Sequence, residues 1–166
     1  MKIVLDGKIY VQKNDILYVI RHLEKKPIPN SVFDRVFSGD TPFVCADHNR
    51  YEFVEFDDKE AIEFFKNLDY SVDYLALKSM SETELCKLGQ EIADKKDELV
   101  KKYNAMTKEE KSANDEILEQ CSMLTFKMLS IRDVVWIKKG QLKIKFPKGI
   151  EENKLISKIK NIIKKR

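Results

Sequence analysis

Two helix start signals, each followed by a long amphipathic stretch, constrain the fold of this chain more than any other feature. Ser81 with Glu84, and Thr107 with Glu110, have the spacing of a capping box, in which two side chains satisfy backbone N–H groups at a helix start. Apolar residues then recur every three or four positions: Leu85, Leu88, Ile92, Leu99, Tyr103 and Met106 follow the first box, and Ile117, Cys121, Leu124, Met128 and Ile131 follow the second. This spacing predicts an antiparallel helical hairpin over residues 81–133 with a coiled-coil-like seam.

Three β-hairpins are expected around the helical hairpin, each from two strand-like stretches with a polar turn between them. Their strands are residues 1–5 with 8–11, 42–46 with 51–56, and 134–137 with 141–146. In the first, Asp6-Gly7 suits the positive φ angles of a type I′ turn. In the third, Lys139, Lys143 and Lys145 alternate with apolar residues, which is the period-2 pattern of a half-buried strand.

Shorter helices complete the predicted fold. Cap residues and apolar spacing predict them over residues 15–25, 30–37 and about 58–68, and a final amphipathic helix with a lysine-rich side over residues 150–166. Residues 70–77 favour a strand or extended chain. The fold class is therefore α+β: three short β-hairpins packed with amphipathic helices, the long helical hairpin and a basic C-terminal helix. We expect one domain over residues 1–166, in which the helical hairpin projects or packs.

Charge is sorted along the chain. Residues 137–166, called here the basic end, hold eleven Lys or Arg against only Glu151 and Glu152, a balance of +9. The whole chain has 31 basic and 28 acidic residues, so residues 1–136 carry a balance of −6. Such asymmetry predicts an anionic partner for one end, because local charge sets long-range attraction. The candidate partner-binding residues are Lys139, Lys143, Lys145, Lys154, Lys158 and Lys160.

The lysines of the third hairpin are the stronger candidates, because a helix dipole accounts only for cations in the last turn of a helix. Basic residues are mainly lysine, a hydrated point charge, which favours nonspecific attraction over reading of a base sequence. The apolar neighbours of Trp136 predict a core anchor between the sheet and the helical hairpin, with base stacking as the alternative.

Two clusters could carry chemistry, and for both we favour an ordinary interpretation. Cys45, Asp47 and His48 could supply a nucleophile and base, or part of a metal site, but a strand and its turn explain them as well. His22, a second potential base, is interpreted as a partly buried packing residue. Asp57-Asp58-Lys59, with Asp40 or Asp47, could form the site of a metal-dependent nuclease. The interpretation that we favour is that these aspartates cap a helix. Familiar phosphate-binding and hydrolase motifs are missing, so we expect no catalytic residues, no metal and no cofactor.

These observations favour a non-enzymatic intracellular interaction protein, such as an inhibitor, adaptor or accessory factor of the kind that mobile genetic elements encode. It would bind an acidic protein surface through the basic end. One alternative is a nucleic-acid-binding protein that contacts the backbone, and a second is the metal-dependent nuclease. The three cysteines form no C-x-x-C pair and no signal peptide is evident, which favours the cytoplasm. A membrane partner is not expected, and a second copy of the chain could complete the seam of the helical hairpin.

Overall fold

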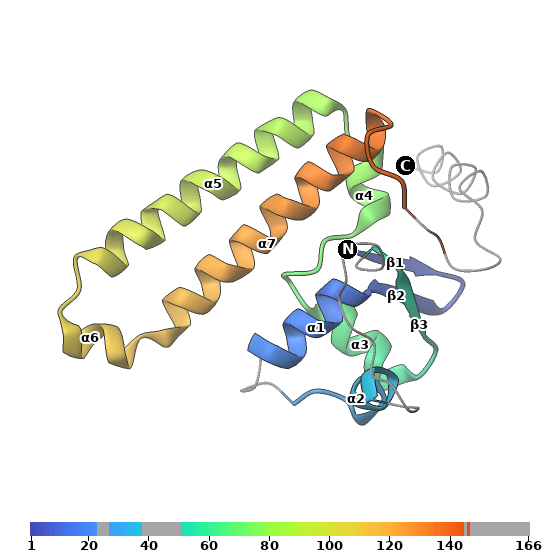
Figure 1. The fold of residues 1–166 in the computed structure, drawn as a ribbon, viewed down its shortest axis with the longest axis horizontal. Coiled ribbons are helices and arrows are strands. Elements are labelled where there is room, and N and C mark those ends of the chain that lie inside the picture. Colours follow the sequence, from blue (N-terminus) through green and yellow to red (C-terminus); the bar gives the residue numbers. More distant parts are fainter. Residues whose placement is uncertain (23–26, 38–50, 145, 147–166) are drawn as a thin grey trace. The chain divides into compact units, whose positions relative to one another are not determined.

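The computed structural model describes residues 1–22, 27–37, 51–144 and 146, and the chain divides into two compact units. One unit contains Met1–Ser79 and the chain from Lys143, and the other contains Met80–Leu142. Figure 1 labels their helices and strands. A three-stranded antiparallel sheet lies in the first unit and long helices form the second, so the predicted α+β class is confirmed.

The sheet of the first unit has the strand order β1-β2-β3, with β1 at Lys2–Leu5, β2 at Lys8–Gln12 and β3 at Phe53–Phe56. The first predicted β-hairpin is confirmed: Asp6 (φ 53°) and Gly7 (φ 76°) form its turn, and Leu5 lies opposite Lys8. Positive φ at both central residues is the requirement of a type I′ turn. Strand β2 is central, and its register pairs Ile9 with Phe56.

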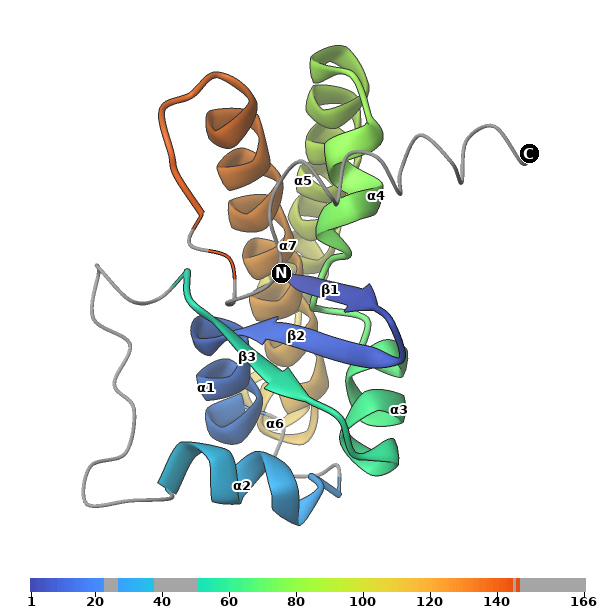
Figure 2. The same ribbon diagram turned by 90° about the vertical axis from the view of Figure 1, so that its right-hand side faces the viewer.

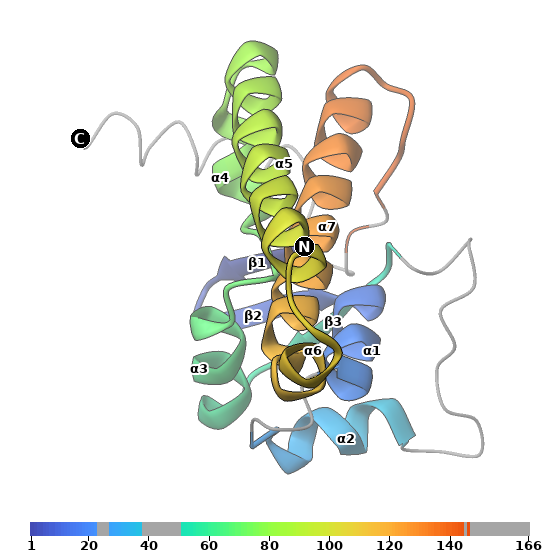
Figure 3. The same ribbon diagram turned by 90° about the vertical axis from the view of Figure 1, so that its left-hand side faces the viewer.

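Helices cover one face of this sheet. Helix α1 spans Lys13–His22, α2 spans Asn30–Phe37 and α3 spans Lys59–Asn67, and α1 and α3 lie on the same face in the two opposed views of Figures 2 and 3. Alternation along the strands places Ile9 and Val11 of β2 on one face of the sheet with Phe56 of β3, toward these helices. Fully or almost fully buried residues from strands and helices form the core: Ile9, Val11, Ile16, Val19, Val32, Val36, Phe56, Ala61 and Phe65.

The start of the chain is buried in a polar cluster. The Met1 ammonium group donates hydrogen bonds to the side chains of Gln12 and Asp15. Ser71 donates to the same Asp15 carboxylate at 2.6 Å, and the Tyr70 hydroxyl donates to the Asp15 carbonyl at 2.5 Å. Burial raises the pKa of Tyr70 well above its ordinary value, so its hydroxyl remains a donor.

Two predictions in the first unit need qualification. Residues 42–50, which include one strand and the turn of the second predicted β-hairpin, lie outside the described residues; its other strand exists as β3 and pairs with β2. The strand predicted over residues 70–77 is wrong, because Tyr74–Ser79 forms helix α4. Asp73 caps this helix by accepting a hydrogen bond from the Ala76 N–H, and the only extended pairing described there is a single bridge between Lys2 and Asp73.

The second unit is the predicted helical hairpin. Helix α5 spans Glu82–Asn104, α6 spans Lys108–Ala113 and α7 spans Asp115–Lys138, and α5 and α7 run antiparallel beside each other (Figure 1). Both capping boxes are formed, with Ser81 and Thr107 as the caps. The prediction is therefore confirmed, although a break at Asn114 separates α6 from α7 and α7 continues past residue 133.

The third predicted β-hairpin is wrong, because residues 134–138 belong to α7. Its Val134-Val135-Trp136-Ile137 sequence has strand propensity, but the buried positions Ile117, Leu124 and Ile131 repeat every seven residues, and Val134 extends the same helical spacing. Packing against α5 therefore overrides local propensity. Residues 141–144 form no strand, and Lys145 lies outside the described residues. In the described part of the chain, no helix is long and apolar enough to span a membrane.

Candidate interaction site at the end of the last helix

A Schellman motif ends α7 and fixes the backbone around the candidate site. Gly140 has φ +71°, and its N–H donates to the Ile137 carbonyl at 3.0 Å. The Gln141 N–H donates to the Trp136 carbonyl at 2.8 Å, which is the second hydrogen bond of the motif. The Lys138-Lys139-Gly140 sequence, which suggested a β-turn, is therefore a helix C-terminus.

Trp136 lies on the outer surface of this last turn. Its side chain is 38% exposed, so the prediction of a core anchor is wrong. The Arg132 guanidinium lies 4.3 Å from the centroid of the Trp136 ring, one turn earlier on the same face. Arg132 also donates to Asp133 at 3.0 Å, an ion pair within its own helix that helps to fix the guanidinium. A cation over an exposed tryptophan ring contributes only about 0.5–1 kcal/mol, so this pair leaves both groups accessible.

Lysines follow the Trp136–Arg132 pair. Lys138 and Lys139 are exposed, and Lys139 forms an ion pair of 2.7 Å with Glu82 at the start of α5. The hydrogen bond that Lys139 donates to Glu82, followed by the attraction between their charges, raises the pKa of Lys139. Lys139 is therefore partly neutralised by its own chain, whereas Lys138 adds an exposed positive charge to the last turn of α7.

The structure describes only two of the six predicted partner-binding lysines. Lys139 ends α7, and Lys143 is exposed in an irregular segment of the other unit, so they do not form the predicted strand face. The other four, Lys145, Lys154, Lys158 and Lys160, lie outside the described residues.

The aspartates that suggested a nuclease have structural roles. Asp58 caps α3: one carboxylate oxygen accepts hydrogen bonds from the Ala61 N–H at 2.8 Å and from the Ser31 hydroxyl at 3.1 Å. Asp57 and Lys59 are exposed. The capping interpretation is therefore confirmed for Asp58. Asp40 lies outside the described residues.

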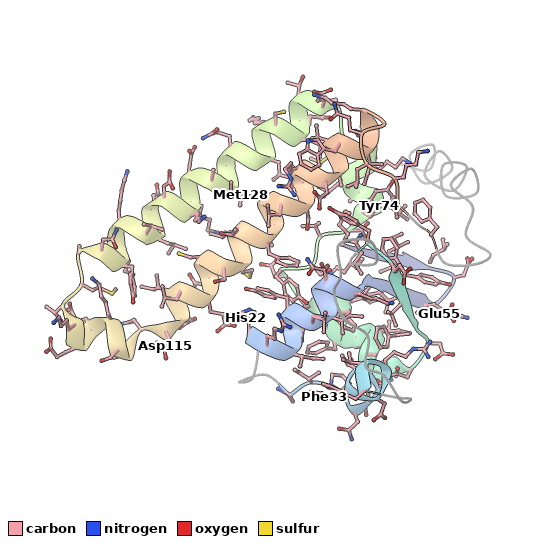
Figure 4. All side chains as sticks on the ribbon, in the orientation of Figure 1. His22, Phe33, Glu55, Tyr74, Asp115 and Met128 are labelled. Carbon is pink, nitrogen blue, oxygen red and sulfur yellow. The ribbon has the colours of Figure 1, made fainter. Side chains whose placement is uncertain are left out.

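Other candidates for catalysis are not brought together. His22 is exposed at the end of α1 (Figure 4), so the expected partial burial is wrong. Its ring centroid lies 4.6 Å from that of Tyr18. Cys45, Asp47 and His48 lie outside the described residues. Among the side chains that the structure describes, no three of His, Cys, Asp or Glu gather as metal ligands would.

Sequence reasoning missed Arg132 and the exposed leucines of α7. Leu118 and Leu129 are 45% and 42% exposed, on the same side of the helix as Trp136. Leu118 and Leu129 precede Trp136 by 18 and 7 residues, which is five and almost two helical turns. Their shared face can therefore be recognised once residues 134–138 are known to be helical.

The chain matches no protein-family model, and neither the curated proteins nor the solved structures contain a match to it.

Proposed function

We propose that this protein is a non-enzymatic interaction protein that binds an acidic surface of another protein, with Trp136 and Arg132 as the anchor and the following lysines as a cationic rim. The observation that carries the proposal is the exposed Trp136 ring with the Arg132 guanidinium 4.3 Å from its centroid. Tryptophan and arginine are the residues most enriched among those that dominate binding energy at protein interfaces.

The arrangement suits an acidic partner both in long-range attraction and in direct contact. Local positive charge from Lys138 and Lys139 would steer a negative surface toward the end of α7, and this steering weakens with salt. On contact, a guanidinium that already lies over the Trp136 ring can offer its remaining N–H groups to a carboxylate. The tryptophan supplies apolar area that the lysines lack.

The same observation favours nucleic acid as the second candidate, because an exposed tryptophan beside lysines can stack on an unpaired base, at about 1–3 kcal/mol per base. We place protein first because the Arg132–Trp136 pair already covers one part of the ring, and bases would need that surface for stacking.

Photocrosslinking inside the native cells tests the proposal. A photoreactive amino acid replaces Trp136 in one variant and Val100, an exposed apolar residue of α5, in a matched control. We expect a protein adduct of defined mass at position 136 only, and we expect Arg132→Glu to remove it. Equal adducts at both positions would contradict the proposal, and a nuclease-sensitive adduct at position 136 would favour the nucleic-acid alternative.

A further inference from the structure

A second line of mostly exposed side chains, which includes Leu118, Leu129 and Trp136, follows the outer side of α7. Its members are spaced alternately three and four residues apart, and we call them the outer stripe: Asp115, Leu118, Ser122, Thr125, Leu129, Arg132 and Trp136. All of them are exposed except Thr125, which is half-buried. This is the spacing of a coiled-coil seam. It lies about 100° around the helix from the buried positions such as Ile117, which pack on the α5 side.

The two ends of the outer stripe carry opposite charges. Asp115 stands at the tip of the helical hairpin (Figure 4), and Arg132 lies near the other end of α7. Between them, the stripe is symmetric about its centre. Residues at equal distances from the centre form three matched pairs: the acidic Asp115 with the basic Arg132, Leu118 with Leu129, and the small hydroxyl residues Ser122 with Thr125.

We propose that the outer stripe is a self-association surface that pairs α7 with α7 of a second copy, antiparallel and about a two-fold axis. In this register Leu118 of one copy meets Leu129 of the other, and the small residues Ser122 and Thr125 meet at the axis. Two identical ion pairs, Asp115 with Arg132, close the ends. A closed two-fold interface requires this self-complementarity.

The charges select both the orientation and the occupant. A parallel pair would place Arg132 against Arg132 and Asp115 against Asp115, and like charges at an interface are unfavourable. An acidic helix from another protein would satisfy Arg132 but would oppose Asp115. The paired segment, from Asp115 to Arg132, is about 26 Å long at 1.5 Å per residue, which is long enough for several turns of knobs-into-holes packing. Trp136 and the lysines lie beyond it, and Arg132 is the one side chain that it shares with the proposed partner site. The inference therefore goes beyond the proposed function and rests on Leu118 and Leu129, which that site does not use.

Sedimentation equilibrium of the purified full chain, with unfolding curves as a check on the fold, tests the association. We expect a concentration-dependent dimer whose dissociation constant rises at least about tenfold in Leu118→Asp, since an apolar contact is replaced by a charge. Val100→Asp makes the same change at an exposed site of α5 and should leave the dimer intact. A chain that remains monomeric at every concentration, or a Leu118→Asp variant that remains as dimeric as the wild type, would overturn the proposal.

The orientation has its own test. In a background with Cys45, Cys86 and Cys121 changed to serine, chains with Leu118→Cys are mixed with chains with Leu129→Cys under mild oxidation. We expect a disulfide between the two different variants and none within either one, because equal positions lie 11 residues apart along the axis of an antiparallel pair, about 16 Å. Disulfides within each variant alone would indicate a parallel pair and overturn the proposed register. Arg132→Asp should weaken the dimer, and adding Asp115→Arg should restore it.

Discussion

At the scale of single residues, a buried ion pair between Asp15 and the Met1 ammonium group lies in the first unit. The Asp15 side chain is 2% exposed and pairs with the Met1 ammonium group, which is fully buried. Such a pair adds little relative to an apolar core of the same shape, but removal of one partner leaves the other charge buried without compensation. Gln12 and Ser71 orient the same cluster, and they are neutral, so neither can replace the carboxylate charge.

Asp15→Asn should therefore lower the free energy of unfolding by about 3–5 kcal/mol, because the Met1 ammonium loses its counter-charge while the shape of the side chain is kept. Urea unfolding followed by circular dichroism measures this change. Asp34→Asn makes the same chemical change at an exposed position of α2 and should stay within about 0.5 kcal/mol of the wild type. Equal effects of the two substitutions would contradict a structural role for the buried pair.

A second ion pair, on the sheet, should give stability that depends on pH. The hydrogen bond that Lys8 donates to Glu55 at 2.5 Å lowers the pKa of Glu55 below its ordinary 4.5, and the same contact raises the pKa of Lys8. Because the folded pKa of Glu55 is depressed, its contribution is present above the unfolded pKa and is lost as pH falls through the folded value.

Glu55→Gln should then be slightly less stable than the wild type at about pH 7 and equal to it at about pH 2, where the carboxyl group is protonated in both states. The effect is small because both side chains are more than a third exposed. Thermal unfolding across this pH range measures it, and a difference that persists unchanged at low pH would show that the charge of Glu55 is not its source.

At the scale of elements, two glycines of the helical hairpin should respond in opposite directions to alanine. Gly140 has φ +71° at the end of α7, where a Cβ costs about 1–2 kcal/mol. Gly89 is inside α5, and a Cβ there would lie 3.9 Å from the Ile131 side chain, an ordinary van der Waals distance. Gly140→Ala should destabilise the protein, and Gly89→Ala should stabilise it by up to about 1 kcal/mol. Denaturant unfolding of both variants measures the two signs, and a stabilising Gly140→Ala would contradict the Schellman motif.

Elements with local signals could be predicted from the sequence, and those set by distant contacts could not. The cap at Ser81 and the turn at Asp6-Gly7 each depend on a few neighbouring residues, and both are confirmed. Residues 134–137 were mistaken for a strand because their side chains are β-branched or aromatic, while their helical state depends on packing against α5. The same error affected the candidate site. Because the predicted helix ended at residue 133, the prediction placed Trp136 in the core, whereas its position on the outer side of α7 leaves it exposed.

At the scale of the whole molecule, the net charge of +3 conceals a basic end with a balance of +9. If partners respond to the basic end and not to the net charge, equal changes in charge at different places will have unequal effects. The structure offers such a comparison, because Glu82 forms an ion pair with Lys139 at the start of the basic end, while Glu60 is exposed on α3.

Glu82→Gln and Glu60→Gln raise the net charge by the same amount, and the first also removes the ion-pair partner of Lys139. Titration of a fluorescent single-stranded oligonucleotide, used as a model polyanion, at several salt concentrations compares them. We expect Glu82→Gln to bind more tightly than both the wild type and Glu60→Gln, and to steepen the dependence of log K on log salt by about 0.7, the increment for one added phosphate contact. The binding of Glu60→Gln should stay close to that of the wild type. Equal gains in the two variants would show that only the net charge matters, and they would remove the reason for assigning anionic partners to the basic end.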